Sequence, residues 1–391
     1  MKSSYILGLC YGGMVCVAIG VNLLPVYFTT FAAVFGGLNE EQLGRIPAVM
    51  FAGVVVGIML SGPLADRFGA RLFTVSGMAV AALGLLLMSV ANGYGTLLAA
   101  GAVSGLGAGI LDMVMSPIVS AVCMNRRAAA LNRLHAFYCI GAIGTVLVAA
   151  AGLYFDVSWR LVAASLALIP LGLLAGFAVA PLPPLVHPDH RREGLRRLIR
   201  RPRFLLALVI IVFVGATEAG MVQWLPAYAE RVLGYSKASG GAALAAFSIA
   251  MAGGRLLASH RLNRLGPHMV VIVAGALCAV LYFLGALLPV PPLALTACVL
   301  VGFACSALWP TCLAITADRF PSGGASMFAL LAAAGNIGCL VIPWMIGLAA
   351  ERTDLRTGIL AGSFVPVLLA LVAVTLWGVD RRTAAASPQA S

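Results

Sequence analysis

The chain has 391 residues, of which 62% are hydrophobic and only 10% are charged, with a net charge of +12 at pH 7. A soluble protein of ordinary composition is about 45–50% apolar and about 25% charged. This chain therefore has too little polar surface to cover a water-soluble core. Its composition excludes a soluble globular protein and indicates a membrane protein with many spans.

Twelve apolar stretches are each long enough to cross the roughly 30 Å hydrocarbon layer of a membrane as a helix, which takes about 20 residues. Six of them precede a segment at residues 182–203 that is rich first in proline and then in arginine, and six follow it. A six-plus-six arrangement is typical of transporters built from two repeats. The predicted spans lie at residues 5–30, 45–65, 72–92, 95–123, 134–155, 159–181, 204–229, 239–260, 268–289, 292–316, 324–350 and 356–378.

We therefore expect an all-α membrane protein in which twelve transmembrane helices form two six-helix bundles around a central cavity. The predicted parts are an N-terminal six-helix bundle (1–181), a cytoplasmic basic linker (182–203), a C-terminal six-helix bundle (204–380) and a cytoplasmic tail (381–391). The nine cysteines fall in or beside apolar spans without paired spacing, so we interpret them as small buried hydrophobic residues.

The distribution of basic residues predicts the orientation in the membrane. With the N-terminus in the cytoplasm, six of the 25 lysines and arginines fall on outer segments and the other 19 on cytoplasmic ones, which is the positive-inside bias. We predict a plasma (inner) membrane protein with both termini in the cytoplasm. The basic run at 190–203 has no interleaved aromatic residues, so we assign it to anionic lipid headgroups and not to nucleic acid.

The loop after the second span, GPLADRFGARLFTVSG at 62–77, combines an acid, two arginines and tight glycine turns. Arg67 and Arg71 can pair with acids or helix C-termini, and such pairs can latch one conformation and release in another. The alternative is an ordinary basic loop that only fixes topology. The loop resembles the signature loop of the major facilitator superfamily. The matching residues, which the resemblance implies act in gating, are Gly62, Asp66, Arg67, Gly69 and Arg71.

Taken with the twelve spans and the central basic linker, this resemblance covers essentially the whole chain. It implies two six-helix bundles that rock around a central cavity, which opens alternately to each side of the membrane.

Two of the thirteen acids, Asp112 and Glu218, lie deep in spans. An ionised carboxylate at mid-membrane costs about 2.5–3.5 kcal/mol by insertion scales, and a protonated one costs much less. Asp112 continues a helical face of small or polar residues, Gly101, Gly105, Ala108 and Ser116. We predict that Asp112 binds and releases the coupled proton, with Glu218 as the second candidate. The alternative is a carboxyl hydrogen-bonded to a neighbouring helix.

The seventh span carries a polar and aromatic sequence, GATEAGMVQWLPAY at 215–228. Glu218, Gln223, Trp224 and Tyr228 together suit a polyol, because an amide, a phenol and a carboxyl bond hydroxyl groups and an aromatic face supports a sugar ring. The alternative for Trp224 and Tyr228 is an aromatic belt at the membrane surface. Pro226 is expected to kink this helix.

The start of the fifth span, with Asn132, His135 and Tyr138, resembles the Asn-x-x-His-x-Phe/Tyr-x-x-Gly segment of the fucose–glucose–hexose symporter branch of the superfamily. The seventh span is similar to that branch too. Residue by residue, the resemblance implicates Asp112, Asn132, His135, Glu218 and Trp224. The chain departs from the branch in the first span, where some members carry an acid and this chain has only Asn22 and, further out, Tyr27.

Two further polar or aromatic positions lie in the tenth and eleventh spans. Asn336 lies between small residues of the eleventh span and is a candidate for the cavity lining, and Trp309 beside Pro310 is a candidate position for a bend in the tenth span. Core packing is the alternative for both. The predicted substrate-binding residues are Asn22, Tyr27, Asn132, His135, Glu218, Gln223, Trp224, Tyr228 and Asn336.

The predicted function is secondary active transport of a small polar solute, best a sugar or similar polyol, by alternating access and coupled to protons. The alternatives are a proton-driven exporter of amphipathic drugs or lipids and an uncoupled uniporter. No HExxH or GxSxG motif is present, so we expect no enzyme, no cofactor and no metal. The expected partners are the solute, protons and membrane lipids, and the expected state is a monomer.

Overall fold

The computed structural model of the chain describes residues 2–124, 127–183, 195–261, 266–320 and 324–386. These residues form helices and no strands. Twelve helical stretches are long and apolar enough to cross a membrane, which confirms the predicted number. The protein is therefore an all-α integral membrane protein. Residues 184–194 lie outside the described residues, so the predicted boundaries of the linker stay a prediction.

The first six spans are built from helices of 20 to 29 residues, except the first, which is composite. Their bounds are α1 (Lys2–Asn22), the short 3-10 helix η1 (Leu24–Tyr27), α2 (Phe28–Val34), α3 (Glu40–Phe68), α4 (Ala70–Ser89), α5 (Tyr94–Val122), α6 (Arg127–Tyr154) and α7 (Trp159–Val179).

The second six spans follow the short helix α8 (Leu195–Leu198). Their bounds are α9 (Pro202–Arg231), α10 (Lys237–Arg261), α11 (Pro267–Leu287), α12 (Pro291–Cys305) continued by α13 (Leu308–Arg319), α14 (Gly324–Arg352), and α15 (Leu355–Gly362) continued by α16 (Phe364–Ala386).

Prolines break some spans and not others. The first span changes to a 3-10 helix at Pro25, where the ring removes a backbone donor. The tenth span is interrupted between α12 and α13, directly before Trp309 and Pro310, at the predicted bend. Pro226, in contrast, lies inside α9, which continues to Arg231 as an unbroken helix.

The helix α3 begins five residues before the predicted second span. Asn39 and Gln42 form a capping box in which each side chain accepts a hydrogen bond from the backbone of the other. Glu40 and Glu41 occupy the first turn, where their negative charge is stabilised by the helix dipole. Capping thus extends the helix into residues that hydropathy alone leaves outside the membrane.

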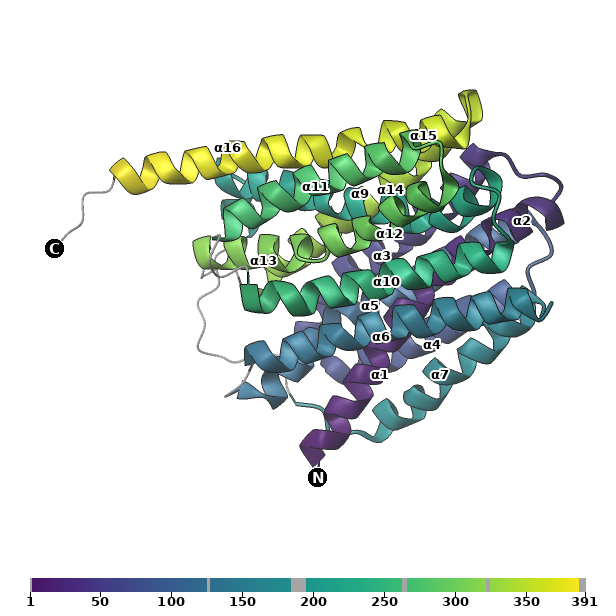
Figure 1. Cartoon of the computed structure of the whole chain (residues 1–391). Coiled ribbons are helices and arrows are strands. Elements are labelled where there is room, and N and C mark those ends of the chain that lie inside the picture. Colours follow the sequence, from purple (N-terminus) through teal and green to yellow (C-terminus); the bar gives the residue numbers. More distant parts are fainter. Residues whose placement is uncertain (1, 125–126, 184–194, 262–265, 321–323, 387–391) are drawn as a thin grey trace.

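The helices pack in two groups that follow the chain. α1 and α3 to α7 pack on one another, as do α9 to α16, and the groups meet mainly through α3 on α14 and α6 on α10. In Figure 1, α1, α6 and α7 occupy the lower part of the view, and α11, α14 and α16 the upper part. The start of α1 and the end of α16 lie toward the same side of the protein, opposite α2, as an even number of spans requires.

The small-residue face of α5 lets that helix approach α3 at backbone contact. A Cβ atom at Gly105 would collide with the carbonyl oxygen of Met50, and one at Gly109 with that of Val54. Small residues serve close helix packing in this way because lipid supplies no hydrophobic force between helices. The face predicted from Gly101, Gly105 and Ala108 is therefore turned to protein and not to lipid.

Candidate functional site

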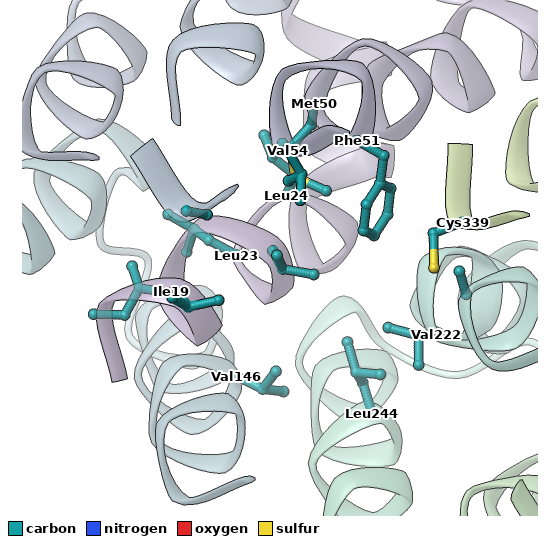
Figure 2. Close-up of a cluster of buried hydrophobic side chains, with 14 of the residues drawn as sticks. Ile19, Leu23, Leu24, Met50, Phe51, Val54, Val146, Val222, Leu244 and Cys339 are labelled. Carbon is teal, nitrogen blue, oxygen red and sulfur yellow. The ribbon is translucent and has the colours of Figure 1, made fainter. Parts of the chain in front are cut away.

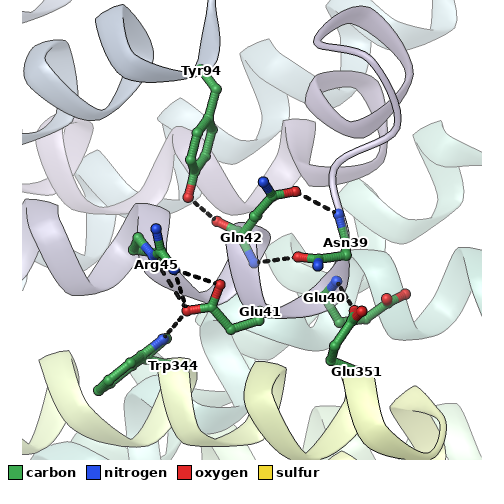
Figure 3. A network of polar contacts seen from close by, with 8 residues as sticks. All are labelled: Asn39, Glu40, Glu41, Gln42, Arg45, Tyr94, Trp344 and Glu351. Atoms are coloured by element: carbon green, nitrogen blue, oxygen red, sulfur yellow. Dashed lines mark hydrogen bonds and ion pairs between the residues drawn. The ribbon is translucent and has the colours of Figure 1, made fainter.

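A network of polar contacts joins the two helix groups where α3 begins, at the end predicted to face outward (Figure 3). Glu40 accepts a hydrogen bond from Arg231 of α9 at 2.6 Å, and Glu41 accepts one from the indole of Trp344 on α14 at 2.7 Å. The backbone N–H of Glu40 donates to Glu351 at 3.2 Å. We call Glu40, Glu41, Arg231, Trp344 and Glu351 the outer gate.

Two glycines make the outer gate tight. A Cβ atom at Gly347 of α14 would collide with the carbonyl oxygen of Glu40, and one at Gly44 of α3 would lie 2.9 Å from the carbonyl oxygen of Pro343. The backbones of α3 and α14 therefore touch here. The end predicted to face outward is closed by backbone contact as well as by the ion pair between Arg231 and Glu40.

Behind the outer gate lies a layer of apolar side chains contributed by both helix groups (Figure 2). Leu23 and Phe51 reach it from the first group, and Val222 and Leu244 from the second, and all four are buried. Phe51 lies 11 residues along α3 from Glu40, so this apolar layer lies deeper in the protein than the outer gate. Its labelled members are Ile19, Leu23, Leu24, Met50, Phe51, Val54, Val146, Val222, Leu244 and Cys339.

The aromatic residues predicted to contact cargo belong to the closed outer end. Trp224 is fully buried, donates its indole N–H to the carbonyl oxygen of Pro343 at 2.8 Å, and packs edge-on against Phe28. Tyr228 is fully buried and donates to the carbonyl oxygen of Gly285 at 2.8 Å. Both therefore link helices in this structure, and neither lies in a belt at the lipid surface. Their contact with cargo stays a prediction.

Gln223 is the unusual member of this group. It is fully buried, and neither its amide nitrogen nor its carbonyl oxygen has a hydrogen-bond partner among the described residues. An unsatisfied buried amide costs about 1–3 kcal/mol, so such a group marks a place where another conformation or a ligand supplies the partner.

A polar cluster lies between the two helix groups, with Asn22 at the depth of the apolar layer and Glu218 and Arg255 further from the outer gate. Asn22 of α1 donates to the hydroxyl of Tyr138 on α6 at 3.5 Å. Arg255 of α10 donates to the thiol sulfur of Cys139 on α6 at 3.0 Å. Glu218 of α9 interacts electrostatically with both Tyr138 and Arg255. We call Asn22, Tyr138, Cys139, Glu218 and Arg255 the interface cluster.

The interface cluster contains residues that the sequence analysis named as site candidates and residues that it did not. Asn22 and Glu218 come from the sequence prediction, and Arg255 does not, because it lies six residues before the end of α10 within a stretch typical of the basic cytoplasmic end of a span. Gly254, directly before it, is the sequence feature that could have pointed to Arg255. A Cβ atom there would lie 2.8 Å from the carbonyl oxygen of Phe303, so the glycine brings α10 onto α12 and positions Arg255 beside it.

The carboxyl of Asp112 is half-buried on the inner half of α5. It has no hydrogen bond and no ion pair with any described residue, so the alternative of a carboxyl bonded to a neighbouring helix finds no support. Its neighbours Leu111 and Met115 pack against glycines of α4 and α1. Asp112 therefore remains available for a proton.

The other predicted residues take structural or surface positions. Tyr27 is buried and donates to the carbonyl oxygen of Ala149 at 3.3 Å. Asn336 is half-buried and bonds the carbonyl oxygen of Ala332 on its own helix. His135 is exposed, although it interacts electrostatically with Arg255. The side chain of Asn132 lies outside the described residues.

The loop of the signature motif closes as predicted at Gly69, whose φ of 84° favours glycine. Arg71 donates to the carbonyl oxygen of Ala180 at the C-terminus of α7, at 2.8 Å, so it ties α4 to α7 within one helix group. Arg67 is exposed over the ring of Phe68, and Gly62 lies beside Ala329 of α14. The side chain of Asp66 lies outside the described residues, and its latch role stays a prediction.

Asp66→Asn is expected to leave substrate affinity close to that of the unchanged protein and to slow turnover, because the change alters a gate and not a binding site. Comparing binding by thermal stabilisation with transport rate in proteoliposomes measures the two effects separately. Normal turnover in this variant would reduce the loop to a signal for topology.

Comparison with known proteins identifies the family. The family model of the Major Facilitator Superfamily matches residues 10–301 and 241–391. The chain belongs to this superfamily. It is a transporter of the major facilitator type and not an enzyme.

The relatives that match nearly the full length of the chain are named for different cargoes. An uncharacterised MFS-type transporter of Yersinia pestis is 26% identical over 90% of each chain. The probable nitrate/nitrite transporter NarK2 of Mycobacterium tuberculosis is 28% identical over 92% of each chain. The putative niacin/nicotinamide transporter NiaP of Bacillus subtilis is 25% identical over 88% of each chain.

A solved structure supports the fold. The crystal structure of a mutant of the nucleoside transporter NupG superposes with a TM-score of 0.78 and covers 96% of this chain and 100% of that one. The identity is 13%, so this likeness concerns the fold alone.

Proposed function

We propose that this transporter moves a small polar solute by alternating access and couples the movement to protons. The observation that carries the proposal is the interface cluster, in which an amide, a phenol, a carboxyl and a guanidinium from both helix groups lie behind a sealed outer end. A solute bound there contacts both groups at once. It can therefore bias one arrangement of the groups over the other, as alternating access requires.

Proton coupling is supported by the two carboxyls inside spans. Asp112 and Glu218 are both half-buried, and neither makes a hydrogen bond or an ion pair with a described residue. A carboxyl that is protonated on one side of the cycle and ionised on the other carries one proton per turnover. We assign the coupled proton to Asp112, as the sequence suggests.

A sugar or similar polyol is the cargo that the sequence favours. Asn22, Tyr138 and Glu218 provide hydrogen-bonding groups for hydroxyls, and they lie together at the interface. The stacking surface of Trp224 would have to be uncovered when the outer end opens. The nitrate/nitrite and niacin/nicotinamide names of the relatives favour a small polar solute without selecting a sugar.

The deciding experiment is a thermal-stabilisation panel on the purified protein, with sugars, nucleosides, small acids and amphipathic drugs. Uptake of the best ligand into proteoliposomes under an imposed proton gradient then tests coupling. Uptake driven by external acid supports symport. Stabilisation only by hydrophobic cations or lipids would favour the exporter instead, and uptake that ignores the proton gradient would favour a uniporter.

We also propose that both termini lie in the cytoplasm, that the host membrane is the plasma (inner) membrane, and that the protein works as a monomer. The support for orientation is the excess of basic residues on one side, 19 against six. A C-terminal cysteine tag is expected to resist membrane-impermeant reagents in intact cells and to react after lysis. Reaction in intact cells would reverse the topology.

A further inference from the structure

We propose that the cargo carries a carboxylate and that this carboxylate binds to the guanidinium of Arg255. The inference rests on the transport function proposed above and narrows its substrate class to small polar acids, such as sugar acids. It comes from the unmet bonding capacity of Arg255, from its position between the helix groups, and from the absence of an ion pair between Arg255 and Glu218 in the described part of the chain.

The hydrogen bonds of Arg255 go mostly to weak acceptors, and none goes to an anion among the described residues. A guanidinium has five N–H donors arranged to grip a carboxylate at two points. Arg255 donates to the carbonyl oxygen of Ser306 at 3.3 Å, to the sulfur of Cys139 at 3.0 Å, and to the sulfur of Met251 at 3.7 Å. Sulfur is a weak acceptor. No carboxylate forms an ion pair with Arg255 among the described residues.

A half-buried guanidinium without an anionic partner is costly, because removal from water is not offset by pairing. Arginine side chains that occur in membrane spans usually face a cavity or a partner and mark the path of an ion or substrate. An anion that pairs with Arg255 would therefore offset the free-energy cost of removing its guanidinium from water. A carboxylate is the common organic anion that fits the fork of the guanidinium.

The position of Arg255 suits a cargo site. It lies on α10 of the second helix group, and the thiol to which it donates lies on α6 of the first. It is 11 residues, about 16 Å along the helix, from Leu244 in the apolar layer. An anion bound at Arg255 would touch both groups and would be shielded from the outer end.

Glu218 gives the site its dependence on protons. It interacts with Arg255 electrostatically but forms no ion pair with it. An ionised Glu218 would repel an incoming carboxylate, and a protonated Glu218 would remove that repulsion and could donate a hydrogen bond. Protonation of Glu218 would then favour binding of the acid, while the coupled proton stays assigned to Asp112.

No other charged group among the described residues near Glu218 competes for this role. The titratable side chains that interact with it, apart from Arg255, are one phenol and four thiols, which are neutral below about pH 8 at their ordinary pKa values. His135 interacts with Arg255 and not with Glu218. The phenol and thiols are Tyr138 and Cys139 on α6, Cys278 on α11, Cys305 on α12 and Cys339 on α14.

The test uses matched pairs of a neutral molecule and its acid: glucose with glucuronate, and nicotinamide with nicotinate. Thermal stabilisation of the purified full chain is measured across concentrations at about pH 6 and about pH 8, so that a dependence on protonation of Glu218 becomes visible. In the unchanged protein at least one acid is expected to bind more tightly than its neutral partner. Equal or better binding of both neutral partners, or no binding of either acid, would overturn the inference.

Arg255→Gln is expected to weaken acid binding by at least about tenfold, because a charge-assisted bidentate contact is lost. Binding of the neutral partner should weaken much less than binding of the acid. Arg255→Lys should recover part of the loss. The matched control is Arg160→Gln, at the predicted outer end, where the arginine donates to the carbonyl oxygen of Ala91. Equal loss of both partners in Arg255→Gln would indicate a structural role and contradict the inference.

A second variant keeps the test decisive if Arg255→Gln does not fold. Glu218→Gln removes the competing negative charge, so it is expected to bind the acid several-fold more tightly at about pH 8 and to lose the preference for low pH. Unchanged pH dependence of acid binding would refute the role of Glu218. Proton-driven uptake of glucose without any binding of glucuronate would leave the proposed function intact and reject only this inference.

Discussion

Asp112→Asn is expected to abolish accumulation of cargo against a gradient while exchange of cargo across the membrane continues. Asparagine imitates the neutral carboxyl in shape but has no proton to release, so the conformational cycle is no longer tied to proton movement. Exchange of a neutral cargo should also lose its dependence on pH between about pH 5 and pH 8, where a transport proton must load and unload. Proteoliposomes with an imposed proton gradient measure accumulation, and counterflow measures exchange.

The structure explains why the effect should be large and specific. Asp112 is half-buried on α5 and has no hydrogen bond or ion pair with a described residue whose loss would disturb packing. Asp156→Asn is the matched control, because Asp156 lies exposed in a loop with a φ of 55°, a conformation that asparagine adopts readily. Its accumulation should equal that of the unchanged protein.

Glu218→Gln separates the two carboxyls in the same assays. If Asp112→Asn accumulates cargo with the usual pH dependence and Glu218→Gln does not, the coupled proton belongs to Glu218. If both variants accumulate cargo normally and external acid never drives uptake, the transporter is not coupled to protons.

Gly347→Val is expected to hold the outer ends of the two helix groups apart. A Cβ atom at this position collides with the backbone of Glu40 and lies 2.9 Å from the ring of Trp224, so α14 and α3 cannot meet. Overpacking typically costs about 1–3 kcal/mol, which shifts the balance between closed and open outer ends by about fivefold to about a hundredfold. Transport should fall because the cycle requires the closed state.

The shift can be measured by combining this change with Val26→Cys. Val26 is 3% exposed and lies 3.3 Å from the position of a Cβ atom at Gly241, across the two groups. The introduced thiol should react faster with a membrane-impermeant maleimide from outside when Gly347→Val is present. Background is low because eight of the nine native cysteines are buried.

The matched control for this variant is Gly144→Val on α6. A Cβ atom added at Gly144 would have nothing within 4 Å, so the added methyl groups should change neither transport nor labelling of the thiol at position 26. Equal labelling in Gly347→Val and the unchanged protein would show that contact at the outer gate does not limit opening.

The amino-acid sequence by itself determined the membrane class, the number of spans, the bend in the tenth span and the two unusual carboxyls. These follow from local physics. A run of apolar residues must form a helix in lipid because backbone groups find no other partner there. A charge inside an apolar run stands out as Asp112 does, and the superfamily loop at 62–77 identifies the architecture.

Only the tertiary structure decided which polar groups meet. Trp224 donates to Pro343, 119 residues away, and Glu40 binds Arg231, 191 residues away. Arg255 reaches Cys139 across 116 residues. Hydropathy places each of these residues at a depth in the membrane but says nothing of its rotation toward a neighbouring helix.

That rotation depends on how helices approach one another, and the approach depends on contacts between distant segments. Gly347 against Glu40 and Gly254 against Phe303 set two of these contacts. From the sequence, the aromatic residues of the seventh span are therefore predicted to contact a sugar ring. In the structure they are buried at the closed outer end. Arg255 looks like a topology signal in sequence. In the structure it interacts electrostatically with Glu218, because packing of α10 on α6 and α12 carries it to the interface of the two helix groups.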